Sequence, residues 1–229
     1  MTTNLTGIVG AKKSKGRKAL SHFLIIGFGM LMLYPVLWMI GSSFKDTAQI
    51  FSEVSLIPNP VVTDNYQRGW EGAGIGFSTY FMNSTIVAVL AVAGNLIACS
   101  LAAYAFARLD FRLRRVLFGA MLATIMLPYH VVIVPQYILF AQLDWVNTFL
   151  PLVAPKFLAV DSFFIFLMVQ FMRGLPTELD QAARVDGAGP WQIYWRIILP
   201  LTVPALATTA IFTFIWTWND FFTPTIYLS

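Results

Sequence analysis

A few hydrogen-bonding side chains stand inside long apolar runs of this 229-residue chain. Polar groups at membrane depth usually face the interior of a helix bundle or a water-filled cavity. Such side chains, together with aromatic rings, could bind a polar solute in a pocket or path through the membrane. The candidates for a solute path of this kind are His130, Gln136, Asn219 and Asp220.

Other polar or aromatic residues in the same runs have simpler interpretations. We expect Asn83 and Asn95 to form hydrogen bonds between helices. Trp216 and Trp218 are more typical of a lipid interface, where aromatic belts are common, than of stacking against a solute, which stays open as the alternative. His130 has only one other histidine in the chain, His22, and no carboxylate beside it, so no metal site is predicted.

The sequence carries no pattern for covalent or nucleotide chemistry. It lacks the G-x-x-x-x-G-K-[ST] loop that holds nucleotide phosphates, so we expect this chain not to hydrolyse ATP. Neither histidine lies in a nucleophile motif. The chain has a single cysteine, Cys99, which lies in an apolar run. Because a disulfide framework or a thiolate cluster needs several cysteines, the sequence excludes both. A non-enzymatic chain without a bound cofactor or metal is therefore expected.

The composition is that of a membrane protein. Apolar residues make up 58% of the chain and charged residues 11%, against about 45–50% and 25% in soluble domains. A membrane-spanning helix needs about 20 mainly apolar residues. Five windows meet this requirement and predict an all-α, polytopic protein with five spans: Ala19–Phe44, Gly72–Ala107, Val116–Leu143, Trp145–Met172 and Ile197–Asn219.

The basic residues predict the orientation of these spans. Three segments that must share one side of the membrane hold 12 of the 15 Lys and Arg: Lys12–Lys18, Arg108–Arg115 and Arg173–Arg196. The opposite side holds Lys45, Arg68 and Lys156. The positive-inside rule then places the N-terminus in the cytoplasm. The basic run at the N-terminus anchors this topology and is not expected to bind nucleic acid.

Three local features refine the path of the chain. The first window is too long for the apolar part of a signal peptide, about 7–15 residues, so we expect a retained helix. The external loop from Lys45 to about Ser78 is irregular, with a short helix around Asp64–Trp70. The third window contains Pro128 and Pro135, and each proline removes a backbone donor, so this window is either kinked or leaves the membrane near Pro135.

The most polar stretch between two spans runs from Glu178 to Pro200. Its start predicts a helix of about ten residues, Thr177–Asp186, with Pro176 in the first turn and a glycine, Gly187, directly after the end. Acidic residues near its start complement the helix dipole. At about 15 Å it is too short to span a membrane.

We expect this helix to present a face with small side chains. Leu179, Ala182, Ala183 and Asp186 recur at helical spacing. After Gly187 a second short segment, Trp191–Ile198, leads into the fifth span. The sequence therefore predicts a small helical hairpin in the cytoplasm that another surface could approach closely.

The stretch resembles the EAA loop of the permease subunits of binding-protein-dependent ABC importers. The pattern of that loop is E-A-A, three residues, G, nine residues and I-x-L-P. Gln181 replaces the glutamate, and the matching residues are Ala182, Ala183, Gly187, Ile197, Leu199 and Pro200. The run P-T-E-L-D-Q-A-A-R-V-D-G-A-G, with MLPYHVVIVPQY and IWTWNDFF, is similar to the sugar-importer branch with six spans. The resemblance covers about residue 20 to the end.

The resemblance implies a division of the chain and a role for the loop. The loop would be the coupling helix that docks on a separate ATPase subunit, which binds the ATP. Gln181 offers hydrogen bonds where a carboxylate could form an ion pair, and Glu178 or Asp180 could take its place. The implied segments are a basic N-terminus at 1–18, a transmembrane domain at 19–229 with its permease core at about 72–229, and the coupling loop at 173–200. The implied loop residues are Glu178, Asp180, Gln181, Ala182, Ala183, Asp186, Gly187, Ile197, Leu199 and Pro200.

The family also implies partners and a mechanism. The partners would be a dimer of ATPase subunits, a second permease subunit, an external solute-binding protein, a sugar and the lipid of the cytoplasmic membrane. Transport would proceed by alternating access. An importer for an amino acid or polyamine, a structural membrane scaffold and a secondary transporter stay open as alternatives. Five spans end outside, whereas the family has six, so we expect the sequence to lack a sixth span.

The predicted topology can be tested with two cysteines introduced into a Cys99→Ala background. Because Asp64 lies in the predicted external loop and Asp186 in the cytoplasmic hairpin, an impermeant maleimide should label Asp64→Cys on intact spheroplasts and leave Asp186→Cys unlabelled. Lysed membranes serve as the control, in which both should react. Equal labelling of the two on intact spheroplasts would contradict this topology.

Overall fold

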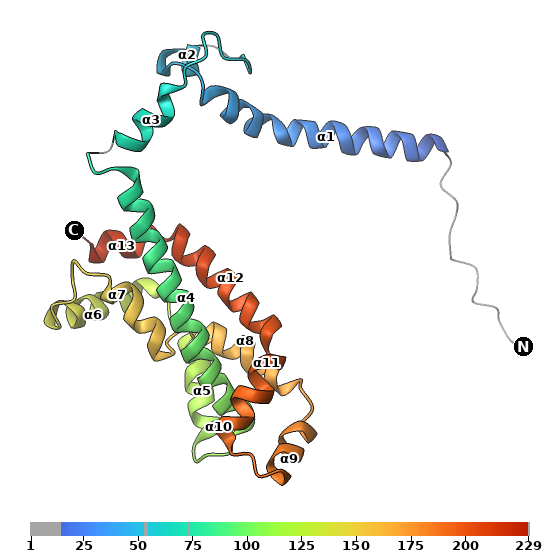
Figure 1. The fold of residues 1–229 in the computed structure, drawn as a ribbon, viewed down its shortest axis with the longest axis vertical. Helices are drawn as coiled ribbons and strands as arrows, with labels where there is room; N and C mark the ends of the chain where they lie inside the picture. The colour runs from blue at the N-terminus through green and yellow to red at the C-terminus, as the bar shows by residue number, and fades with distance from the viewer. Residues whose placement is uncertain (1–14, 53–54, 73, 229) are drawn as a thin grey trace, which may run out of the picture. The chain divides into compact units, whose positions relative to one another are not determined.

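The computed structural model describes residues 15–52, 55–72 and 74–228, and the secondary structure of these residues is entirely helical (Figure 1). Residues 12–14 of the basic run lie outside the described residues. The chain divides into two units, Met1–Ser78 and Thr79–Ser229. Because the two units are separate bodies, each is described by itself.

The first unit consists of a long apolar helix and a folded loop. Helix α1, Lys15–Ser42, is long and apolar enough to cross a membrane and has exposed apolar side chains along its length. Helices α2, Thr47–Ser52, and α3, Asp64–Glu71, follow. The short helix expected around Asp64–Trp70 is therefore confirmed as α3.

The start of α3 is fastened to the end of α1. The Asn65 side-chain amide donates hydrogen bonds to the carbonyl oxygens of Ser43, at 3.1 Å, and of Lys45, at 2.7 Å. The Tyr66 and Ser43 hydroxyl oxygens lie 2.8 Å apart. These contacts satisfy backbone groups just beyond the helix, where no intrahelical partner exists.

Helix α4, Phe77–Arg108, is the longest element and the centre of the second unit. One of its faces is lined by small buried residues such as Ala88, Ala91 and Gly94. A Cβ atom added at Gly94 would lie 2.8 Å from Phe157 Cδ2 and 3.0 Å from the Lys156 carbonyl carbon. Small residues at such positions let segments approach closely, which drives packing where lipid replaces water.

The third window is a helix pair with a sharp bend. Helices α5, Arg114–Thr124, and α6, Tyr129–Gln142, meet at an angle of 102°. Pro128 lies at the break with extended backbone, whereas Pro135 lies inside α6. The expected kink is confirmed and lies at Pro128, whereas α6 continues through Pro135 to Gln142. An exit from the membrane near Pro135 stays a prediction.

The fourth window consists of three consecutive helical pieces. They are α7, Leu150–Val153, the 3₁₀ turn η1, Ala154–Leu158, and α8, Ser162–Arg173. Together they are long and apolar enough to cross a membrane. The break lies at Ala159, which has a positive φ of 55°, and Asp161 precedes α8.

The last part of the chain also bends. After α9, Glu178–Val185, come α10, Pro190–Ile193, the π-helical segment η2, Tyr194–Ile198, and α11, Leu199–Leu201. The chain then turns by 74° into α12, Val203–Asn219, and ends in α13, Phe222–Tyr227. The described residues thus contain three segments able to span a membrane, and five if each bent pair forms one span. The predicted all-α membrane fold is confirmed.

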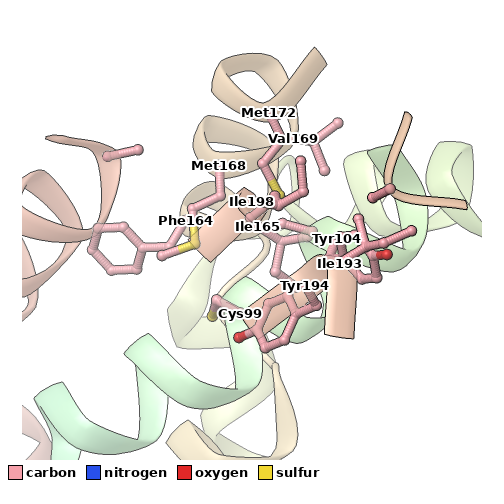
Figure 2. Close-up of a cluster of buried hydrophobic side chains, with 13 residues drawn as sticks. Cys99, Tyr104, Phe164, Ile165, Met168, Val169, Met172, Ile193, Tyr194 and Ile198 are labelled. Atoms are coloured by element: carbon pink, nitrogen blue, oxygen red, sulfur yellow. The ribbon is translucent and has the colours of Figure 1, made fainter. Parts of the chain in front are cut away.

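The main core joins α4, α8 and the segment that follows α9 (Figure 2). Helix α8 contributes a buried apolar stripe that repeats at helical spacing. Figure 2 shows Tyr104 and Cys99 of α4 beside Tyr194 and Ile193, with the methionines of α8 above them in this view. A second core, around Phe140 and Tyr227, joins α6, α7 and α13. The members of the α8 stripe are Phe164, Ile165, Met168, Val169 and Met172.

The close approach at Gly94 predicts a stability difference between two alanine substitutions. Gly94→Ala should destabilise the protein by about 1–3 kcal/mol, because the new methyl group overlaps the η1 turn. Gly119→Ala is the matched control, since its Cβ would meet nothing within 4 Å and alanine favours a helix. Thermal unfolding in detergent should show a lower Tm for Gly94→Ala alone. Equal Tm values for both variants would contradict the close packing of α4.

Candidate functional site

The helix of the polar stretch ends as the sequence predicts. Gly187 has a φ of 82°, a left-handed conformation that favours glycine. The Ala188 N–H donates to the Ala183 carbonyl at 2.9 Å and the Gly187 N–H to the Arg184 carbonyl at 3.0 Å. This pair of bonds is a Schellman motif and satisfies the last carbonyls of α9. Helix α9 is one residue shorter at each end than the predicted Thr177–Asp186.

The faces of α9 differ from the expected pattern. Asp180 and Ala183 are buried against the rest of the second unit. Ala183 packs in the main core, so the prediction that it shares an open face with Ala182 is wrong. The open face instead includes Val185, whose exposed fraction is 88%. We define the outer face of α9 as four exposed residues: Glu178, Gln181, Ala182 and Val185.

Arg108, the last residue of α4, holds the inner side of α9. Its Nη1 lies 3.4 Å from Asp180 Oδ2, and the exposed fractions of the two side chains are 3% and 9%. Its Nη2 donates to the carbonyl oxygens of Met172, at 2.7 Å, and Leu175, at 2.8 Å. The expectation that Asp180 could form an ion pair with a partner subunit is wrong, because Arg108 and the core cover it.

Two more α4 residues hold the second half of the stretch. The Tyr104 hydroxyl donates to the Pro190 carbonyl at 2.8 Å. The Ser100 and Tyr194 hydroxyl oxygens lie 2.8 Å apart, and the rings of Tyr104 and Tyr194 are 5.2 Å apart between centroids. Ser100, Tyr104 and Arg108, four residues apart on one side of α4, form what we call the α4 stripe. The α4 stripe was not among the predicted site residues, although the four-residue spacing of its members is visible in the sequence.

The end of the stretch forms a corner. The Leu199 N–H donates to the Tyr194 carbonyl, a π-helical bond, and the next residue, Pro200, has no N–H. Thr202 Oγ1 donates to the Ile198 carbonyl at 2.7 Å where the chain bends into α12. The predicted loop residues Ile197 and Leu199 pack against the main core. The segment is therefore fixed to its own protein on one side.

The second feature is a cavity of about 1160 Å³ in the second unit. Its wall includes residues of α4, α5, α6, α8, α12 and α13. All four residues that the sequence placed on a solute path line it: His130, Gln136, Asn219 and Asp220. Helices distant in the sequence thus bring these side chains to one space.

The polar residues of the cavity are supported locally. The Asn219 amide donates to the Ile215 carbonyl at 2.8 Å, and Asp220 Oδ1 accepts the Thr223 N–H at 3.0 Å. The His130 ring lies 5.1 Å from the Phe222 ring between centroids. Trp216, expected at a lipid interface, lines the cavity and packs against Phe163 and Phe164. The cavity therefore combines aromatic surfaces with a few oriented polar groups.

A cluster of half-buried charged residues and buried polar residues forms part of the cavity wall. Lys156 Nζ lies 2.8 Å from Asp161 Oδ2, which also accepts a 2.6 Å hydrogen bond from the Asn95 amide. The same amide donates to Thr213 Oγ1 at 3.1 Å, so the expected interhelical role of Asn95 is confirmed. Lys156 and Asp161 line the cavity as a neutralised pair, a feature that the sequence interpretation had not identified.

The comparisons with known proteins agree with this architecture. The profile of a family described as "Binding-protein-dependent transport system inner membrane component" matches residues 94–229. The diacetylchitobiose uptake system permease protein NgcG of Streptomyces coelicolor is 35% identical over 206 residues, which cover 90% of this chain and 68% of that protein.

Two further relatives match a slightly larger share of this chain. The arabinooligosaccharides transport system permease protein AraQ of Halalkalibacterium halodurans is 33% identical over 222 residues, which cover 94% of this chain and 78% of that protein. The sn-glycerol-3-phosphate transport system permease protein UgpE of Yersinia pestis is 32% identical over 221 residues, with coverages of 94% and 78%.

A solved structure shares the fold. It is a bacterial ABC transporter involved in the import of the acidic polysaccharide alginate, with a TM-score of 0.82 and 24% identity. The match covers 96% of this chain and 77% of that chain. The profile match and the three relatives above 30% identity establish that this chain belongs to the family of binding-protein-dependent transport system inner membrane components and is a permease subunit.

Proposed function

We propose that this permease subunit imports a sugar or an oligosaccharide across the cytoplasmic membrane, driven by ATP hydrolysis in a separate subunit. The observation that carries the proposal is the form of the 178–200 stretch. A short helix is clamped to the protein by one side, through Asp180 and Ala183, and exposes the other side. A helix that is fixed to the protein on one side and exposed on the other can transmit the movement of a docked partner to the membrane helices.

The outer face of α9 supports docking on the ATPase subunit. Ala182 is small enough to let another surface approach closely, and Glu178 and Gln181 offer a carboxylate and an amide beside it. Because Asp180 is turned inward, Glu178 is the acidic residue that takes the place of the missing glutamate at position 181. The Schellman motif at Gly187 keeps this short helix formed.

The proposal also names the partner subunits and the orientation of this chain in the membrane. The partners are two ATPase subunits that bind the ATP, a second permease subunit and an external solute-binding protein. This chain itself needs no cofactor. Residues 1–18 form a basic cytoplasmic N-terminus and residues 19–229 the transmembrane domain, with its permease core from about 72 and its coupling loop at 173–200. The distribution of Lys and Arg supports this orientation.

The cavity supports a neutral carbohydrate as the solute. Its aromatic residues can cover the apolar faces of sugar rings, and Gln136 and Asn219 can bond their hydroxyl groups. Its one lysine, Lys156, is already paired with Asp161, so an anion gains little there. The names of two relatives refer to diacetylchitobiose and to arabinooligosaccharides, which are neutral sugars of this kind.

Docking through the outer face of α9 predicts a specific effect of a large side chain. Ala182→Trp should abolish co-purification of the ATPase subunit and ATP-driven uptake, because the indole holds the docking surfaces apart. Asp110→Trp is the control, since the Asp110 side chain is 99% exposed and forms only a long, exposed ion pair with Arg114. Normal co-purification with Ala182→Trp would rule out this docking face.

The role of the cavity can be tested with one substitution at two sites of α6. Gln136→Leu should raise the KM for uptake about 2- to 10-fold, the effect of one lost hydrogen bond. The uptake probes are labelled N,N′-diacetylchitobiose, arabinotriose and glycerol 3-phosphate, in proteoliposomes with all partner subunits. Gln142→Leu, at the exposed end of the same helix and outside the cavity, should leave KM unchanged. Equal KM values for the two variants would contradict this solute path.

A further inference from the structure

We propose that the α4 stripe is the mechanical link between the docking loop and the cavity, with Arg108 and Tyr104 as its positioning residues. This inference rests on the proposed docking of α9. Ser100, Tyr104 and Arg108 follow one another at four-residue intervals, so they lie on one side of α4. Each of them bonds a different part of the chain between Met172 and Tyr194.

Arg108 makes the strongest of these attachments. One guanidinium group bonds the end of α8, the following turn and α9, through Met172, Leu175 and Asp180. Hydrogen bonds from an ionised donor are about twice as strong as neutral ones. Only 3% of the Arg108 side chain is exposed, so water does not compete for its donors. A displacement of α9 therefore pulls on the end of α4.

Helix α4 extends this attachment to the cavity. It is continuous over 32 residues, and Val87 in its other half lines the cavity wall. At 1.5 Å per residue, Val87 and Arg108 are roughly 32 Å apart along the helix. Asn95, between them, is bonded to Asp161 and to Thr213 of α12. Figure 1 shows α12 beside α4, and the bond between Asn95 and Thr213 joins the two helices. Both helices line the cavity, so a shift of α4 moves its own part of the wall and the part that α12 forms.

The geometry of the ion pair leaves room for a second arrangement. The contact between Arg108 and Asp180 is a single one of 3.4 Å, longer than the 2.7–2.9 Å typical of such bonds. Arg108 Nε and Asp180 Oδ1 are buried and have no hydrogen-bond partner among the residues that the structure describes. A shift of α9 that brings Asp180 Oδ1 to Arg108 Nε would replace the present contact with Nη1, because Nε–H and Nη1 point to different edges of the guanidinium plane. The contact is thus suited to two discrete positions of α9.

The test uses the complex of this chain with its partner permease and ATPase subunits. A Val87→Cys reporter in a Cys99→Ala background measures, by its maleimide labelling rate, the effect of nucleotide on the cavity wall. Adding ATP with vanadate should change the rate at least about 5-fold. With Asp180→Asn the ATPase subunit should still co-purify, but the nucleotide effect should fall below about 2-fold. Arg108→Lys, which keeps the charge and loses the fork of donors, should give an intermediate effect.

The controls separate this inference from the proposed docking. Asp110→Asn removes an exposed ion pair near the same end of α4 and should keep the full nucleotide effect. A cross-link from Ala182→Cys to the ATPase subunit reports docking alone, so its failure refutes the proposed function and the inference that rests on it. Docking together with a full nucleotide effect in Asp180→Asn overturns the inference only. No nucleotide effect at Val87→Cys without further substitution overturns it as well.

A second variant decides the matter if Asp180→Asn fails to fold or loses the ATPase subunit. Tyr104→Phe removes only the hydroxyl that bonds the Pro190 carbonyl and keeps the ring against Tyr194. We expect it to reduce the nucleotide effect at Val87→Cys about 2-fold, with the ATPase subunit bound. An unchanged effect in this variant overturns the inference.

Discussion

A buried guanidinium group at the end of α4 organises the part of the molecule that carries its function. A charge with only 3% of its side chain exposed must be paired and hydrogen-bonded, because burying it alone is very costly. Arg108 meets this requirement with the end of α8, the turn after it and Asp180 of α9. The need to satisfy one charge therefore fixes three segments at one point. Tyr104 and Ser100 extend the same attachment to the second half of the loop.

Polar groups in the wall of the cavity also satisfy one another. Lys156, Asp161, Asn95 and Thr213 satisfy one another in the wall, and the rest of the surface combines aromatic rings with the polar side chains of His130, Gln136, Asn219 and Asp220. Breaks in the helices lie at Pro128, at Ala159 and at Thr202, and irregular backbone of this kind is tolerated at membrane depth where it is buried in protein or lines a cavity. Pro128 separates α5 from α6, and Thr202 bonds back to Ile198 before α12. Irregular backbone thus occurs beside the cavity or against the core.

Much of the fold and part of the site could be predicted from the sequence. The apolar windows predicted the membrane helices, and Gly187 predicted the end of α9, because hydropathy and a left-handed glycine are local properties. His130, Gln136, Asn219 and Asp220 were found as polar groups in apolar runs, and they line one cavity. The side of α9 that faces the protein could not be predicted, since a helix of eight residues has too few turns for periodicity to decide. The partner of Asp180 is distant in the sequence, so the pairing with Arg108 appears only in the folded chain.

The central claim is that α9 docks on an ATPase subunit by its outer face while Arg108 holds its inner face. The most direct measurement is a cryo-electron microscopy structure of the assembled importer with nucleotide bound. The account predicts Glu178, Gln181 and Ala182 in contact with the ATPase subunit, and Asp180 still turned toward Arg108. An α9 that lies free of the ATPase subunit, or that meets it through Asp180 and Ala183, would contradict the account.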